Sequence, residues 1–143
     1  MIELEDLPPA KVRWLASFPK SGNTWVRAFL ANLMIPEEAP ISLDQLSRIP
    51  FITDKKPKTY TQKEIIGKAH HPYKPERHDT TPAEYIVRNP LDVVPSAAAF
   101  FNVSVDRMAK EVAKDWSRHV QSWWGHAGLV LKYENMPDNF HVL

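Results

Sequence analysis

The sequence has 143 residues, contains no cysteine and carries a formal net charge of +1. A chain of this length predicts a single domain, residues 1–143, large enough to bury a core. The nearly balanced charge gives no reason to expect nucleic acid or an anionic membrane as a partner. The absence of cysteine excludes disulfides, thiolate metal sites and a cysteine nucleophile. The acidic N-terminus lacks a long apolar run, which argues against a signal peptide or membrane anchor and predicts a cytoplasmic protein.

An apolar run at 12–18 predicts a buried strand, and apolar residues at helical spacing in 26–34 predict a helix. The segment that joins them, residues 18–25, is named the phosphate loop below. The first N–H groups of a helix have no intrahelical partners and lie at the positive end of its dipole, so they favour a bound phosphate. Four residues of the loop add to this preference through charge, hydroxyl groups or close backbone approach: Lys20, Ser21, Gly22 and Thr24.

The rest of the chain alternates predicted strands and helices. Short apolar runs predict three further strands, at 65–69, 85–87 and 129–131. Cap residues and apolar spacing predict three further helices, one beginning at Pro90 after Asn89, one through 105–112 after Ser104, and one through 116–123 before Gly125. Residues 35–63 show no sustained period, although 42–46 could form a short helix. The alternation predicts an α/β fold of three layers, with helices on both faces of a parallel sheet and a P-loop-like nucleotide-binding architecture.

Polar side chains follow directly from four of the predicted strands. They are Lys20, His70, Arg88 and Tyr133. Because chemistry gathers at the carboxyl ends of the strands in such sheets, we expect these four side chains to share one cleft.

The phosphate loop reads Pro-Lys-Ser-Gly-Asn-Thr-Trp over 19–25. It differs from the ordinary nucleotide P-loop because the upstream glycine is missing and Pro19 directly precedes Lys20. It resembles instead the 5′-phosphosulfate loop of sulfotransferases that use 3′-phosphoadenosine-5′-phosphosulfate (PAPS), with Asn23 where the family more often has Thr. Arg88 and Ser96, in Arg-Asn-Pro-Leu-Asp-Val-Val-Pro-Ser, resemble the family's 3′-phosphate signature.

The resemblance implies a role for each matching residue. Lys68-Ala69-His70 is similar to the family's Lys-Thr-His, in which the histidine is the catalytic base and the lysine stabilises the transferring group. Lys20 would stabilise the departing nucleotide, and imidazole suits removal of a proton near neutral pH. Tyr133 looks like the tyrosine that helps to frame the adenine. Trp25 either borders the nucleotide or is a buried helix residue.

The resemblance implies PAPS as co-substrate, a small-molecule acceptor with a hydroxyl or amine group, and no metal. A metal site built from His70, His71 and His78 is the alternative at this place, and no ligand-spaced carboxylate or cysteine accompanies them. The other histidines and one pair of lysines are interpreted as solvated or structural: His78, His119, His126, His141 and Lys55-Lys56. Two other functions stay open, a shortened nucleotide-binding or interaction module without turnover and a small P-loop kinase.

The resemblance covers about 12–136. Family members usually continue past the segment that matches Tyr133-Glu134-Asn135-Met136, with a basic element that completes the 3′-phosphate site. The sequence is therefore expected to be a fragment, a naturally shortened member, or a chain whose missing part is supplied by another chain. An exposed apolar patch or a homo-oligomer interface is expected where the missing part would have packed. Neither the acceptor nor the oligomeric state can be inferred from these residues.

Overall fold

A computed structural model describes residues 11–34, 51–53, 64–78 and 83–139. Five strands form one parallel sheet in the order β2-β3-β1-β4-β5. They are β1 (Lys11–Ser17), β2 (Phe51–Thr53), β3 (Glu64–Ala69), β4 (Ala83–Val87) and β5 (Leu129–Lys132). The predicted parallel sheet is confirmed, and β2 is a strand that the sequence pattern did not predict.

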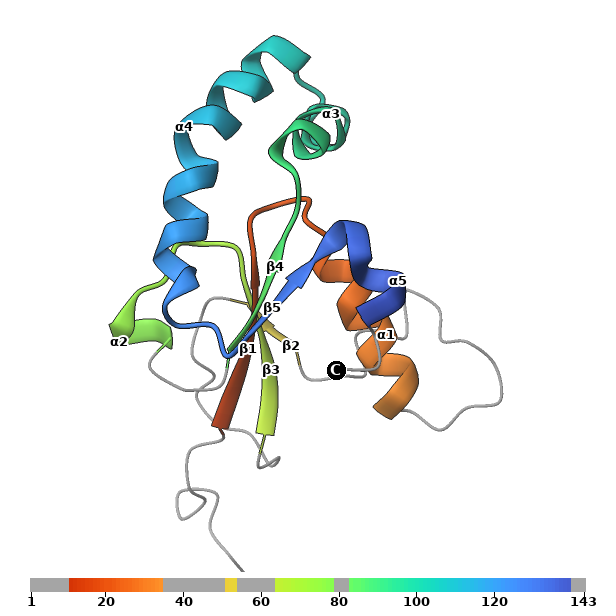
Figure 1. Cartoon of the computed structure of the whole chain (residues 1–143), viewed down its shortest axis with the longest axis vertical. Helices are drawn as coiled ribbons and strands as arrows, with labels where there is room; N and C mark the ends of the chain where they lie inside the picture. The colour runs from red at the N-terminus through yellow and green to blue at the C-terminus, as the bar shows by residue number, and fades with distance from the viewer. Residues whose placement is uncertain (1–10, 35–50, 54–63, 79–82, 140–143) are drawn as a thin grey trace, which may run out of the picture.

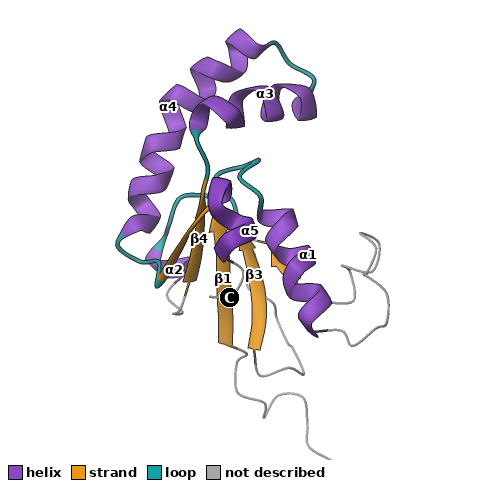
Figure 2. Ribbon diagram, turned by 45° about the vertical axis from the view of Figure 1, so that its right-hand side comes forward, coloured by secondary structure: helices purple, strands orange, loops and turns teal. Residues whose placement is uncertain are grey.

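The helices cover both faces of the sheet. They are α1 (Asn23–Met34), α2 (Pro75–His78), α3 (Pro90–Phe101), α4 (Val105–Trp124), the 3-10 turn η3 (Tyr133–Asn135) and α5 (Met136–Asn139). Figure 1 shows α1 and α5 on one side of the sheet and α4 on the other, with α3 beyond the carboxyl ends of the strands. Figure 2 shows the same three layers from a second direction. The expected three-layer α/β fold is therefore confirmed. No helix in the described ranges is long and apolar enough to cross a lipid bilayer.

Successive residues of β1 pack on opposite faces of the sheet, as the two-residue period of a strand requires. Trp14 and Tyr85 form a buried cluster with Trp123 of α4 on one face. Leu15 and Ile86 pack with residues of α1 and α5 on the other face. The central strands are thus buried on both sides, which is typical of a parallel sheet.

The prediction of two helices over 105–123 is wrong, because α4 runs without a break from Val105 to Trp124. The apolar positions repeat every three or four residues along it, and no glycine or proline interrupts them. The caps are confirmed: Ser104 accepts a hydrogen bond from the N–H of Arg107, Asn89 accepts one from the N–H of Leu91, and Gly125 follows the last residue of α4. The possible helix at 42–46 lies outside the described residues.

Candidate functional site

The phosphate loop connects β1 to α1 through two residues in the left-handed backbone region. Lys20 has a φ of 65° and Gly22 a φ of 99°. The N–H of Ser21 donates to the carbonyl of Phe18 at 3.3 Å, and the N–H of Val26 donates to the carbonyl of Gly22 at 3.1 Å. The loop therefore turns sharply and delivers the N-terminus of α1 to the carboxyl end of the sheet.

Gly22 is fixed by its neighbours as well as by its φ. A Cβ at this position would lie 2.5 Å from Cδ2 of Tyr133 and 3.0 Å from Cε of Met136. Because atoms do not approach so closely, a side chain at position 22 would displace the Tyr133 ring. The segment after β5 is therefore packed directly on the phosphate loop.

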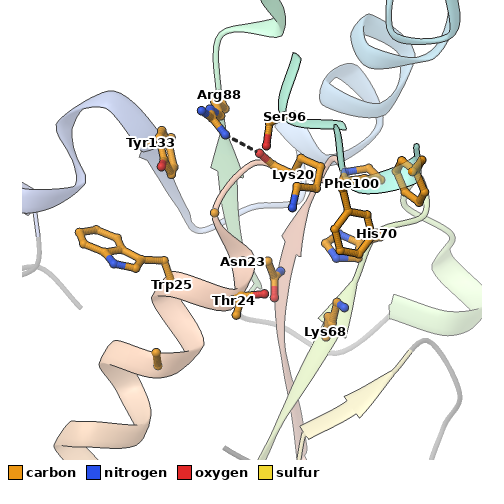
Figure 3. A pocket seen from close by; sticks show the side chains of 14 residues that line it. Lys20, Asn23, Thr24, Trp25, Lys68, His70, Arg88, Ser96, Phe100 and Tyr133 are labelled. Carbon is orange, nitrogen blue, oxygen red and sulfur yellow. Dashed lines mark hydrogen bonds between the residues drawn. The ribbon is translucent and has the colours of Figure 1, made fainter. Parts of the chain in front are cut away.

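Arg88 joins the ends of β4 and β1. Its Nη1 donates to the carbonyl of Lys20 at 2.9 Å (Figure 3). Its guanidinium carbon lies 4.2 Å from the centre of the Tyr133 ring, within the range of a cation–π contact. The Nε atom of Arg88 is buried and has no hydrogen-bond partner among the described residues. Two groups, the Lys20 carbonyl after β1 and the Tyr133 ring after β5, thus meet at the Arg88 guanidinium, whose Nε is a donor without a partner in the described ranges.

One pocket of about 520 Å³ collects the predicted site residues at the carboxyl end of the sheet. It is called the nucleotide pocket below, after the ligand that the sequence resemblance implies. Of the residues singled out in the sequence, it is lined by Lys20, Gly22, Asn23, Thr24, Trp25, Lys68, His70, Arg88, Ser96 and Tyr133. The expected shared cleft is present.

Ser21 and Asn23 lie differently from the other loop residues. Ser21 does not line the nucleotide pocket, and its hydroxyl is buried without a partner among the described residues. Asn23 lines the pocket, but its Nδ2 donates inward to the carbonyl of Leu15 at 2.9 Å. This amide ties the first residue of α1 to β1, a supporting contact that the sequence did not suggest.

Two aromatic residues border the nucleotide pocket. Trp25 is 48% exposed, which rules out the buried-helix interpretation, and it lines the pocket (Figure 3). Phe100 of α3 lies under the Lys20 ammonium, with Nζ 4.2 Å from the ring centre. The Lys20 side chain is therefore held towards the pocket by an aromatic face.

His70 lies between the nucleotide pocket and a second pocket of about 440 Å³. Its Nδ1 lies 2.9 Å from the carbonyl of Ser17. A carbonyl can only accept, so Nδ1 carries the proton and Nε2 is the basic nitrogen of the neutral ring. The apolar lining of the second pocket comes from the phosphate loop, the chain after β3, α3 and α4: Phe18, Pro19, Pro72, Ala97, Phe101, Met108 and Val112.

His119 is a residue near the site that the sequence left among the structural histidines. It is only 2% exposed, its Nδ1 lies 2.8 Å from the hydroxyl of Tyr85, and its Nε2 lies 3.1 Å from the carbonyl of His70. Burial is the main cause that lowers the pKa of His119 to about 4, while hydrogen bonds with the backbone of His70 and His71 oppose this shift and the charges of those two histidines favour it. Burial also raises the pKa of Tyr85. His119 lies in the buried stripe of α4 with Val112 and Trp123, and this spacing was the signal that could have identified it as a buried residue.

His78 also has a structural role, because its buried ring packs edge-on against Trp14 and its Nδ1 accepts from the N–H of Lys74. Over the described ranges, no group of three or more histidine or carboxylate side chains is placed to hold a metal ion. His141 and Lys55-Lys56 lie outside those ranges.

Comparison with known proteins agrees with this geometry. The model of the Sulfotransferase domain family matches residues 11–142, and the chain belongs to this family. A solved structure described as retinol dehydratase in a complex with retinol and PAP superposes with a TM-score of 0.62 at 14% identity. The match covers 94% of this chain and 58% of that chain, so this chain spans little more than half of that protein's length. A search of curated proteins gives no significant match.

Gly22→Ala tests the packing of the loop. We expect the free energy of unfolding to fall by about 1–3 kcal/mol, because the new Cβ strains the backbone and pushes on Tyr133. Gly125→Ala is the matched control, since a Cβ there meets nothing within 4 Å. Urea unfolding compares the two variants, and equal stability would show that the close approach of Tyr133 is not a constraint.

The buried His119 predicts an acid-sensitive fold. A histidine whose folded pKa is lowered from 6.5 to about 4 contributes stability that is complete above about pH 6.5 and is lost as the pH falls towards 4. The loss is about 3 kcal/mol at most, at about 1.4 kcal/mol per pH unit. Urea unfolding between pH 7 and pH 4.5 measures it, and a His119→Phe variant with the same pH dependence as the wild type would contradict it.

Proposed function

We propose that this chain transfers the sulfuryl group of PAPS to a hydroxyl or amine group of a small-molecule acceptor. The observation that carries the proposal is one pocket lined by both Lys20 and Arg88, two cations that follow adjacent parallel strands. A donor that is anionic at its 5′ and 3′ ends needs two such sites. Membership in the Sulfotransferase domain family supports the reaction, and the PAP in the complex of the similar solved structure supports the nucleotide.

The residues fit the two anionic ends of this donor. The N-terminus of α1, the Lys20 ammonium and the exposed Thr24 hydroxyl would hold the 5′-phosphosulfate. The Arg88 guanidinium, with its unused Nε donor, and Ser96 would hold the 3′-phosphate. Gly22 allows the backbone to approach an oxyanion, and Tyr133 and Trp25 would border the adenine.

The position of His70 supports a role as general base. His70 would take the acceptor's proton at Nε2, while the acceptor oxygen or nitrogen forms a bond to sulfur and the bond from sulfur to the 5′-phosphate oxygen breaks. Lys20 would offset the negative charge that develops on this departing oxygen. Lys68, at the end of β3, would stabilise the group in transfer.

The second pocket is the proposed acceptor site. His70, Pro19 and Phe101 line both pockets, so an acceptor in the second pocket would meet the donor at His70. Its lining is mainly apolar, with charged residues of α4 at the side, which suits a small acceptor that exposes one polar group.

Three substitutions separate the proposed roles. We expect His70→Ala to lower kcat about 10²–10⁴-fold, the usual contribution of a general base, and Lys20→Ala to lower it about 10²–10³-fold through the lost charge stabilisation. Arg88→Ala should weaken nucleotide binding about 10–100-fold, the value of a charged hydrogen bond. Lys110→Ala, exposed and outside both pockets, is the control. Unchanged transfer by His70→Ala in a sulfate-transfer assay would remove the proposed base.

Calorimetric titration distinguishes the proposal from the two other functions. We expect adenosine 3′,5′-bisphosphate to bind more tightly than ATP with magnesium, because Lys20 and Arg88 in the pocket would each hold one of its two phosphates. Preference for ATP would favour a kinase. Tight binding of the bisphosphate without any transfer from PAPS would favour a binding module.

A further inference from the structure

The C-terminal part of α4 holds the irregular segment that follows β3. The segment 70–73, which includes the proposed base, is neither helix nor strand, so its backbone groups need partners elsewhere. Three side chains within one turn of α4 supply them. His119 Nε2 lies 3.1 Å from the carbonyl of His70, Trp123 Nε1 donates to the carbonyl of His71 at 3.0 Å, and Ser122 Oγ accepts from the N–H of Tyr73 at 3.0 Å.

The hydrogen-bond directions around His119 are set by chemistry. The carbonyl of His70 can only accept, so Nε2 of His119 carries the proton. The ring is buried, which favours its neutral form, so Nδ1 is an acceptor and the Tyr85 hydroxyl donates to it at 2.8 Å. Two hydrogen bonds therefore connect β4, through Tyr85 and His119, to the backbone of His70.

His119 does not act as a base itself in this arrangement. Its ring borders the second pocket, but both of its nitrogens are engaged, one with a carbonyl and the other with a hydroxyl. Phe18 packs edge-on against it, with ring centres 5.5 Å apart. His119 instead holds the backbone carbonyl of His70 in place.

We infer that His119 and Tyr85 are positioning residues that fix His70 relative to the phosphate loop, an inference that rests on the proposed function. The His70 ring is held by Ser17 on the loop side and its carbonyl by His119 on the helix side. Two attachments on opposite sides of one residue set the location of Nε2 as well as its tautomer. A displacement of about 1 Å at a reacting group can cost about 10²-fold in rate, so this constraint bears on turnover rather than on nucleotide binding.

A set of four variants separates positioning from a merely structural role. His119→Phe keeps a ring but removes both hydrogen bonds, and it leaves the Tyr85 hydroxyl buried without an acceptor. The double variant Tyr85→Phe/His119→Phe removes that hydroxyl too, and replacing both partners by apolar groups of similar shape restores much of the stability. Its His70 carbonyl still lacks a donor. His119→Gln can donate to His70 and accept from Tyr85. His126→Phe is the matched control, because the exposed His126 ring stacks on Tyr73 and a phenylalanine ring can replace it there.

We expect kcat to fall about 10–100-fold in His119→Phe and to stay low in the double variant although its melting temperature recovers. KM for PAPS and the Kd for adenosine 3′,5′-bisphosphate should change less than about threefold, because the phosphate loop is left intact. His119→Gln should restore most of kcat, and His126→Phe should leave it unchanged. Recovery of kcat together with melting temperature in the double variant would overturn the inference. If His119→Phe does not fold, kcat and melting temperature are compared between the double variant and the wild type, and the same outcomes apply.

A measurement without turnover keeps this inference separable from the proposed function. Imidazole ¹⁵N spectra should show His70 protonated at Nδ1 in the wild type and a mixture of tautomers in the double variant. An unchanged His70 tautomer in the double variant would overturn the positioning role, whatever the activity. Absence of transfer in the wild type, with the expected change in tautomer, would overturn the proposed function alone.

Discussion

The parallel pairing of β1 with β4 is the constraint on which the site depends. Ser17 pairs with Ile86, so the chain leaves both strands at the same edge of the sheet and within a few residues. The strand order places β3 and β2 on one side of this pair and β5 on the other. The connections that leave β1 and β4 lead to helices on opposite sides of the sheet, and a crevice forms between their first residues. The phosphate loop and Arg88 occupy its two sides.

The loop conformation has a cost that the surrounding contacts offset. A lysine at positive φ is uncommon and costs about 1–3 kcal/mol, so it persists only when neighbours over-determine it. Here the Lys20 carbonyl accepts from Arg88, its ammonium lies over Phe100, and Tyr133 packs on Gly22. These partners come from β4, α3 and the segment after β5, so the loop is set by the assembled fold and not by its own sequence.

Most of the architecture could be predicted because its signals are local. Strand and helix periods, the Asn89 and Ser104 caps, and the sequence of the phosphate loop each lie within a few neighbouring residues. Strand β2 was missed because it has only three residues in a stretch without a pattern. The link from His119 to Tyr85 joins a helix to a strand 34 positions apart, and no local pattern encodes it. Residue spacing also could not predict which loop side chains are buried. In the structure the Asn23 amide points inward to β1, whereas Trp25 is half-exposed.

A crystal structure of this chain with adenosine 3′,5′-bisphosphate tests the central claim most directly. We expect the 5′-phosphate at the N-terminus of α1, within about 3 Å of backbone N–H groups of the phosphate loop. The 3′-phosphate would lie on the Arg88 guanidinium, with Nε as one donor. A nucleotide bound with both phosphates on one side of the β1–β4 boundary, or bound away from Arg88, would contradict the claim.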